Sequence, residues 1–193
     1  MSDGASRRVT AVIDPPVSVV IETKLHPPEL FAEYVSRPRL IEQLDAASIR
    51  PLTVVTAPTG YGKSTLLAAW CEQATRAARC AWLSLDQSDN DPVVLWTYAL
   101  QALRRLEPEH FADQLRALQT PGVSLARDVL PSFLNELWTL ETVLVLVLDD
   151  YHEVTSADCH ESLMFLLRRL PSTLRRRRAR PAHSVARLLV VSL

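Results

Sequence analysis

Ala57-Pro-Thr-Gly-Tyr-Gly-Lys-Ser-Thr65 is the stretch that decides the fold of this chain. The apolar, β-branched run Leu52-Thr-Val-Val-Thr56 precedes it and is typical of a buried strand. The apolar residues that follow it at helical spacing are Leu66, Leu67, Trp70, Cys71 and Ala74. A glycine-containing turn between a strand and a helix, ending in Gly-Lys-Ser, indicates a loop that binds the phosphates of a nucleoside triphosphate.

The spacing of this loop predicts a role for each residue type. We expect Lys63 to reach the terminal phosphates and Ser64 to complete a Mg²⁺ shell. Gly60 and Gly62 stand where a Cβ would obstruct the curl of the backbone. Ala57 replaces the usual first glycine, and the alternative is an ordinary turn before a helix. The predicted nucleotide-binding residues of the loop are Pro58, Thr59, Gly60, Tyr61, Gly62, Lys63, Ser64 and Thr65.

A second apolar run, Val143-Leu-Val-Leu-Val-Leu148, is followed directly by Asp149 and Asp150. Such a run suits a central parallel strand, and ligands of open α/β sheets bind at the carboxyl ends of the strands. We predict that Asp149 holds Mg²⁺ and that Asp150 orients or activates the attacking water, so Asp150 and Lys63 are the candidate catalytic residues. The alternative is an Asp pair that ends a strand in a turn. The neighbouring His152 is open to two interpretations, a γ-phosphate sensor or a turn cap.

Hydrophobic periodicity places the remaining elements. The expected strands span about 52–56, 80–85, 143–148 and 185–192, and the other expected helices span about 37–47, 93–106 and 124–140, the last capped by Ser124. We interpret Asp89 and Asp91, after the second strand, as turn and N-cap residues rather than ligands. The prediction is a three-layer α/β fold of a P-loop NTPase, with a parallel sheet flanked by helices and incomplete at its carboxyl end.

Composition restricts the class of protein. The chain has 193 residues, 48% of them hydrophobic and 22% charged, as in ordinary globular domains. It contains no apolar run near the roughly 18 residues needed to span a bilayer, and residues 1–16 lack a signal-peptide core, so we expect a cytoplasmic protein without membrane contact. Cys71, Cys80 and Cys159 are scattered and odd in number, which favours reduced thiols.

The carboxyl end is unusually basic. Residues 168–193 contain eight arginines and no carboxylate side chain. One interpretation is a truncated or frame-altered end, and the other is an arm that binds nucleic acid or another polyanion without sequence selectivity. Residues 185–193 are apolar enough to form a substitute strand.

Six segments of the chain together resemble the maltose-regulator-like LuxR transcription factors, which are signal-transduction ATPases of the STAND class. The resemblance extends from about Thr23 to about Pro171. In chain order the segments are Thr23-Lys-Leu-His-Pro27, Val35-Ser-Arg-Pro-Arg-Leu40, Ala57-Pro-Thr-Gly-Tyr-Gly-Lys-Ser64, Ala81-Trp-Leu-Ser-Leu-Asp86, Asp89-Asn-Asp-Pro92 and Leu148-Asp-Asp-Tyr-His152.

The resemblance implies an ATP/ADP switch that works with Mg²⁺ and controls self-association in the parent family. It also implies that Val35 and Arg37 contact the adenine side of the nucleotide, although Arg37 also fits a surface position at a helix start. Some kinases carry a similar ATPase region. In the family, a further strand ends in an arginine that senses the nucleotide, and residues 172–183 depart from that pattern.

We therefore expect a flexible leader at 1–22, an NTPase domain at 23–171 and an Arg-rich aberrant or truncated tail at 172–193. The expected function is an ATP/ADP-binding switch module of a LuxR-type regulator, truncated before the sensor and DNA-binding domains, with weak or no hydrolysis. No specific DNA binding is expected from this chain alone. The alternatives are a stand-alone ATPase and a polyanion-binding protein that uses the Arg-rich tail.

Overall fold

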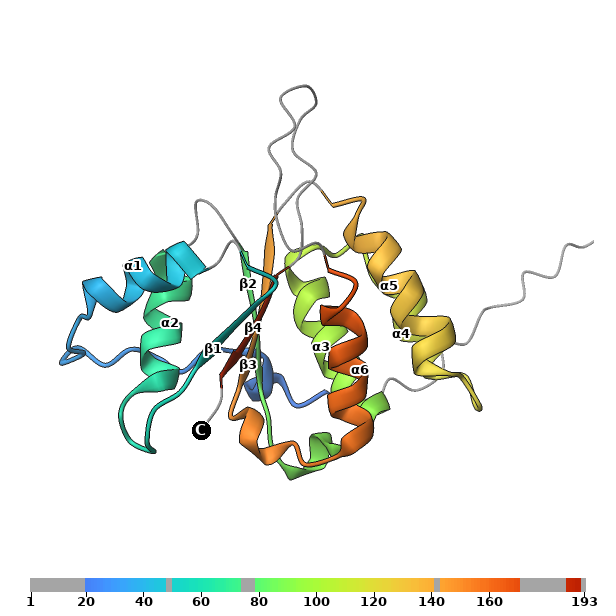
Figure 1. Cartoon of the computed structure of the whole chain (residues 1–193), viewed down its shortest axis with the longest axis horizontal. Coiled ribbons are helices and arrows are strands. Elements are labelled where there is room, and N and C mark those ends of the chain that lie inside the picture. The colour runs from blue at the N-terminus through green and yellow to red at the C-terminus, as the bar shows by residue number, and fades with distance from the viewer. Residues whose placement is uncertain (1–19, 48–49, 74–78, 141–142, 171–186, 192–193) are drawn as a thin grey trace, which may run out of the picture.

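A computed structural model describes residues 20–47, 50–73, 79–140, 143–170 and 187–191 (Figure 1). Three predicted parts lie outside these ranges. They are most of the predicted leader, Ala74 of the helix predicted after the phosphate loop, and residues 172–186 and 192–193 of the predicted tail. The described strands form one parallel sheet in the order β1-β4-β3-β2. Their bounds are Leu52–Val55 for β1, Arg79–Ser84 for β2, Leu144–Asp149 for β3 and Arg187–Val191 for β4.

The strand β4 occupies the middle of the sheet. It pairs with β1 on one side, where Val54 faces Val190, and with β3 on the other, where Leu146 faces Leu188. The fourth strand expected at about 185–192 is therefore confirmed, and it is the element that joins β1 to β3. In this order the carboxyl ends of β1 and β3, which carry the phosphate loop and the Asp pair, are brought to the same edge.

Helices cover both faces of the sheet, which confirms the predicted three layers (Figure 1). Two of them lie on one face: α1, Pro38–Ala47, and α2, Lys63–Gln73. The helices on the other face are α3, Pro92–Leu106; α4, Ala112–Leu118; α5, Leu130–Leu137; and α6, Ala157–Leu167.

The strand β3 separates two hydrophobic cores. Its six residues are all buried, and their side chains alternate between the faces as strand geometry requires. Leu144, Leu146 and Leu148 pack into the core under α3 to α6, whereas Val145 and Val147 pack into the core under α1 and α2. Because both faces are apolar, β3 reads in the sequence as a continuous hydrophobic run.

The helix expected at 124–140 differs from the prediction. Residues Leu125–Val129 form a π turn, in which the Leu130 N–H donates to the Leu125 carbonyl, and α5 follows it. Pro131 explains the break, because proline has no N–H for a regular helical bond and its ring clashes with the preceding turn. The cap predicted at Ser124 is also wrong: its side chain makes no capping bond, and its backbone N–H donates to Asp128 at 2.9 Å.

A short 3₁₀ helix near the start of the described chain, η1 at Glu22–Leu25, packs against β2 and α3. It carries Lys24, whose ammonium lies 2.5 Å from Asp89 and 3.1 Å from Asp86. Asp89 is fully buried, and the aromatic ring of Tyr98 lies 4.8 Å from the Lys24 nitrogen. Burial alone would lower the pKa of Lys24, but the hydrogen bonds and charges of Asp89 and Asp86 raise it.

Candidate nucleotide-binding site

The phosphate loop connects β1 to α2. Gly60 and Gly62 have φ values of 83° and 74°, in the left-handed region that favours glycine. A Cβ on Gly60 would meet no atom within 4 Å, and one on Gly62 would lie 3.7 Å from Arg37, an ordinary contact. The predicted reason for these glycines, steric obstruction, is therefore wrong, and the backbone conformation is what requires them.

Two side chains from α2 point toward the groups that the chemistry needs. The Lys63 ammonium donates hydrogen bonds to the carbonyls of Ala57 at 2.7 Å and Pro58 at 3.3 Å, so it lies over its own loop. The Ser64 hydroxyl donates to a carboxylate oxygen of Asp149 at 2.9 Å. This bond connects residues 85 positions apart in the sequence and joins the loop to the end of β3.

Asp149 is a buried carboxylate, 4% exposed. Burial raises its pKa, and the charge of Asp150 adds to this, whereas the hydrogen bond from Ser64 opposes it. A hydroxyl and a carboxylate at hydrogen-bond distance are the oxygen ligands that Mg²⁺ takes beside phosphate oxygens. Ser64 and Asp149 therefore fit a Mg²⁺ ion, which would supply charge neutralisation for the phosphates when bound. Within the described residues, no group of three or more His, Cys, Asp or Glu side chains is arranged as a metal site.

The chain turns sharply after Asp149. Asp150 has a left-handed backbone, with φ at 55°, and its side chain is exposed. Aspartate is among the few residues other than glycine that adopt this conformation at modest cost. It precedes the 3₁₀ helix η5, Tyr151–Glu153. Asp149 and Asp150 therefore lie in different surroundings although they are neighbours.

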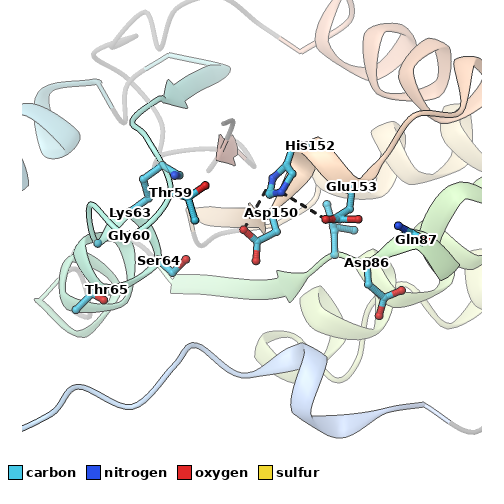
Figure 2. Close-up of a pocket in the computed structure, with 12 residues that line it drawn as sticks. Thr59, Gly60, Lys63, Ser64, Thr65, Asp86, Gln87, Asp150, His152 and Glu153 are labelled. Atoms are coloured by element: carbon cyan, nitrogen blue, oxygen red, sulfur yellow. Dashed lines mark ion pairs between the residues drawn. The ribbon is translucent and has the colours of Figure 1, made fainter.

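A pocket of about 820 Å³ lies at the carboxyl edge of the sheet (Figure 2). Its phosphate-loop wall is formed by Thr59, Gly60, Gly62, Lys63, Ser64 and Thr65. The remaining lining residues are Leu85, Asp86, Gln87, Asp150, His152 and Glu153. Figure 2 shows Asp150 and His152 between the loop and the wall that carries Asp86, Gln87 and Glu153. The pocket therefore has a basic loop at one side and carboxylates at the other.

His152 lies between two of these carboxylates. Its Nδ1 is 3.9 Å from Asp150, and its Nε2 is 3.4 Å from Glu153 (Figure 2). Because it lines the pocket, the imidazole borders the space that a ligand would fill.

The structure does not bring every predicted residue to this pocket. Asp149 is not among its lining residues and borders, with Ser64 and Ser84, a second cavity of about 740 Å³. Pro58 and Tyr61 do not line the pocket, and neither do Val35 and Arg37. Arg37 instead contacts the outside of the loop, where its guanidinium donates to the Tyr61 carbonyl at 2.9 Å, and the Val35 side chain is 74% exposed. The adenine role of Val35 and Arg37 stays a prediction.

The predicted site residues do not include four residues that line the pocket: Leu85, Asp86, Gln87 and Glu153. The first three follow β2 at the edge where ligands of open α/β sheets bind, and Asp86 was expected at this edge but was not assigned to the site. Asp86 caps the 3₁₀ helix η3, Gln87–Asn90. Asp91 caps α3, which confirms that Asp91 is an N-cap residue as predicted. Asp89 completes the cap at η3 through its side chain, 2.8 Å from the Asp86 N–H, and is also the buried partner of Lys24.

Asp149→Asn is expected to stabilise the protein without Mg²⁺ at neutral pH and to remove most of the stabilisation that Mg²⁺ and nucleotide give together. A group whose pKa is raised on folding contributes stability that is present at low pH and is lost as pH rises through the raised pKa. Asparagine removes that cost, keeps an oxygen to accept from Ser64, and binds Mg²⁺ poorly.

Thermal unfolding at pH 5 and pH 7.5, with and without ADP and Mg²⁺, checks this expectation. Asp158→Asn is the matched control, because Asp158 is exposed on α6 and does not line the pocket. A lower unfolding midpoint for Asp149→Asn than for the wild type at pH 7.5 without Mg²⁺ would contradict the argument.

No helix in the described part of the chain is both long and apolar enough to cross a membrane.

Comparison with known proteins supplies independent information. The sequence model of the AAA ATPase domain matches residues 34–179. The serine/threonine-protein kinase PknK of Mycobacterium tuberculosis is 35% identical over 146 residues, which are 75% of this chain and 13% of that protein. The HTH-type transcriptional regulator MalT is 33% identical over 156 residues in Cronobacter sakazakii and 31% over 154 in Vibrio parahaemolyticus, about 80% of this chain and 17% of each relative. The chain thus spans less than a fifth of the length of these curated relatives.

Proposed function

Because the chain belongs to the AAA ATPase domain family, we propose that residues 23–171 form an ATP/ADP-binding switch that works with Mg²⁺ inside a larger regulatory protein. The observation that carries the proposal is the contact between Ser64 and Asp149 at 2.9 Å, beside a pocket lined by the phosphate loop. This contact supports a metal site at the point where the loop and the end of β3 meet.

Each polar group has a defined part in the proposal. The loop N–H groups and Lys63 hold the phosphates, with the Lys63 ammonium exchanging its two carbonyl partners for phosphate oxygens. Ser64 and Asp149 hold Mg²⁺. Asp150, exposed in the pocket, accepts a hydrogen bond from the attacking water and orients it.

Hydrolysis by the chain alone is proposed to be slow. Lys63 is the only Lys or Arg among the described residues that line the pocket. Three carboxylate side chains line the same pocket: Asp86, Asp150 and Glu153. An arginine that neutralises transition-state charge can contribute a factor of about 10³ or more in phosphoryl transfer. Binding is therefore expected to be better developed than turnover, as suits a switch rather than a stand-alone ATPase.

The relatives suggest what the switch controls. A protein kinase and transcriptional regulators both contain a segment similar to this chain. We propose the regulator type, the ATPase region of a LuxR-type transcription factor in the cytoplasm, which the six segments named above resemble in order; these segments do not distinguish it from the similar region of a kinase. In this proposal the bound nucleotide governs self-association, and the chain makes no specific DNA contact by itself.

Thermal unfolding with ADP–Mg²⁺ and with ATP–Mg²⁺ tests the proposal. A ligand that binds only the native state adds about 2.7 kcal/mol to the free energy of unfolding at one hundred times its Kd. We expect both nucleotides to raise the unfolding midpoint, and EDTA to remove most of the rise. A cooperative transition with an unchanged midpoint would contradict nucleotide binding.

A further inference from the structure

One side chain joins the two loops that form the far wall of the pocket. Asn90 ends η3, and both polar groups of its side chain are in use. Its amide nitrogen donates to the Glu153 carbonyl at 2.9 Å and to the Gln87 carbonyl at 3.2 Å. Its oxygen accepts from the backbone N–H groups of Thr155 at 2.6 Å and Ser156 at 2.8 Å.

The bonds from Asn90 cross between distant parts of the chain. Glu153, Thr155 and Ser156 lie 63 to 66 residues away in sequence, in the segment between β3 and α6. Ser156 stands at the N-cap of α6 but makes no capping bond with its own side chain. Asn90 thus satisfies two backbone donors that immediately precede α6, and does so from another element.

Both loops that Asn90 joins carry pocket residues. Gln87 comes from the loop after β2, and His152 and Glu153 come from the loop after β3. Asn90 itself does not line the pocket. The distance between the two loops, and with it the position of the far wall, therefore depends on a residue that contacts no ligand.

The far wall lies beyond Asp150 when seen from the phosphate loop (Figure 2). In the proposed nucleotide complex the lysine of such a loop binds the terminal phosphates, so the phosphate chain would extend from Lys63 toward Asp150. A diphosphate would leave the space in front of His152 and Glu153 open, and a third phosphate would extend into it.

We propose that Asn90 is a positioning residue that sets the spacing of the far wall and thereby favours a bound triphosphate over a diphosphate. This inference rests on the proposed nucleotide-binding function. It assigns the discrimination between ATP and ADP to the contact between the loops that follow β2 and β3. The phosphate loop and the Mg²⁺ ligands, in contrast, bind both nucleotides.

The test measures affinity for two ligands in four proteins. Isothermal titration with ADP–Mg²⁺ and with the β,γ-imido analogue of ATP and Mg²⁺ is applied to the wild type, Asn90→Ala, Asn90→Asp and Asn135→Ala. Asn135 is an exposed asparagine on α5 and serves as the matched control. Asn90→Asp keeps an oxygen that accepts from Thr155 and Ser156 but loses the donor to Glu153 and Gln87.

We expect Asn90→Ala to weaken binding of the triphosphate analogue about tenfold more than binding of ADP, since it removes the hydrogen bonds that join the two loops of the far wall. Asn90→Asp should show a smaller preferential loss, and Asn135→Ala none. An equal loss for both ligands would overturn the inference in favour of a general packing role, and no loss would overturn it as well. If Asn90→Ala does not fold, a preferential loss in Asn90→Asp is still required. A folded wild type that binds neither nucleotide would instead reject the proposed function itself.

Discussion

Lys63→Ala is expected to weaken binding of ADP–Mg²⁺ and of the ATP analogue by at least about 100-fold. Charge-assisted hydrogen bonds contribute about 1.5–3 kcal/mol each, and the ammonium makes two bonds that phosphate oxygens would replace. No other Lys or Arg lines the pocket within the described residues, so nothing in that wall compensates. Isothermal titration gives the affinities directly.

Two variants make the result specific. Lys63→Arg keeps the charge on a different shape and should retain part of the affinity. Arg116→Ala removes an exposed cation on α4 that pairs with Asp113, far from the loop in sequence, and should change nothing. Wild-type affinity in Lys63→Ala, with an intact unfolding transition, would show that Lys63 does not bind the phosphates.

Lys24→Met is expected to lower the free energy of unfolding by about 3–5 kcal/mol, because it leaves a buried carboxylate without its partner. Asp89 is fully buried, and its other carboxylate oxygen makes no hydrogen bond in the described structure. The raised pKa of Lys24 means that this stability is present at neutral pH and is lost as pH rises through that value. Urea unfolding at pH 7.5 measures the change.

Arg105→Met provides the matched control for Lys24→Met. Arg105 pairs with Glu22, which lies on the same 3₁₀ helix as Lys24. Both side chains of this pair are exposed, so the loss in the free energy of unfolding should stay below about 1 kcal/mol. The double variant Lys24→Met with Asp89→Asn should recover part of the stability, since it removes the uncompensated charge. Equal costs for Lys24→Met and Arg105→Met would mean that the buried pair has no special role.

The sequence was sufficient to predict those parts of the site whose residues are neighbours along the chain. The phosphate loop lies between a strand and a helix, and the Asp pair ends a strand, as predicted. The comparisons also confirm the resemblance to the maltose-regulator-like family. Lys24 and Asn90 were inside two of the six family segments, yet their roles were not predicted. Each acts on residues more than 60 positions away, and only the packed structure brings those partners together.

Local chemistry also accounts for the errors of prediction. The apolar periodicity of residues 125–137 is real, but Pro131 prevents a continuous α-helix, which periodicity alone does not detect. Trp138 continues the apolar pattern of this segment, but it follows the last residue of α5 and is 49% exposed.

The position of β4 in the sheet also affects folding during translation, because the strands leave the ribosome in sequence order. The nascent chain presents β1, β2 and β3 well before residues 187–191, yet β1 has no partner among the described strands except β4. Translation at about 5–20 residues per second leaves β1 with an open edge for some seconds after its synthesis. Until β4 emerges, the loop that carries Ser64 has no strand pairing to hold it against Asp149. A nascent chain should therefore acquire nucleotide binding only after residues 187–191 have left the ribosome, and a pause in translation before them would prolong exposure to chaperones and to aggregation.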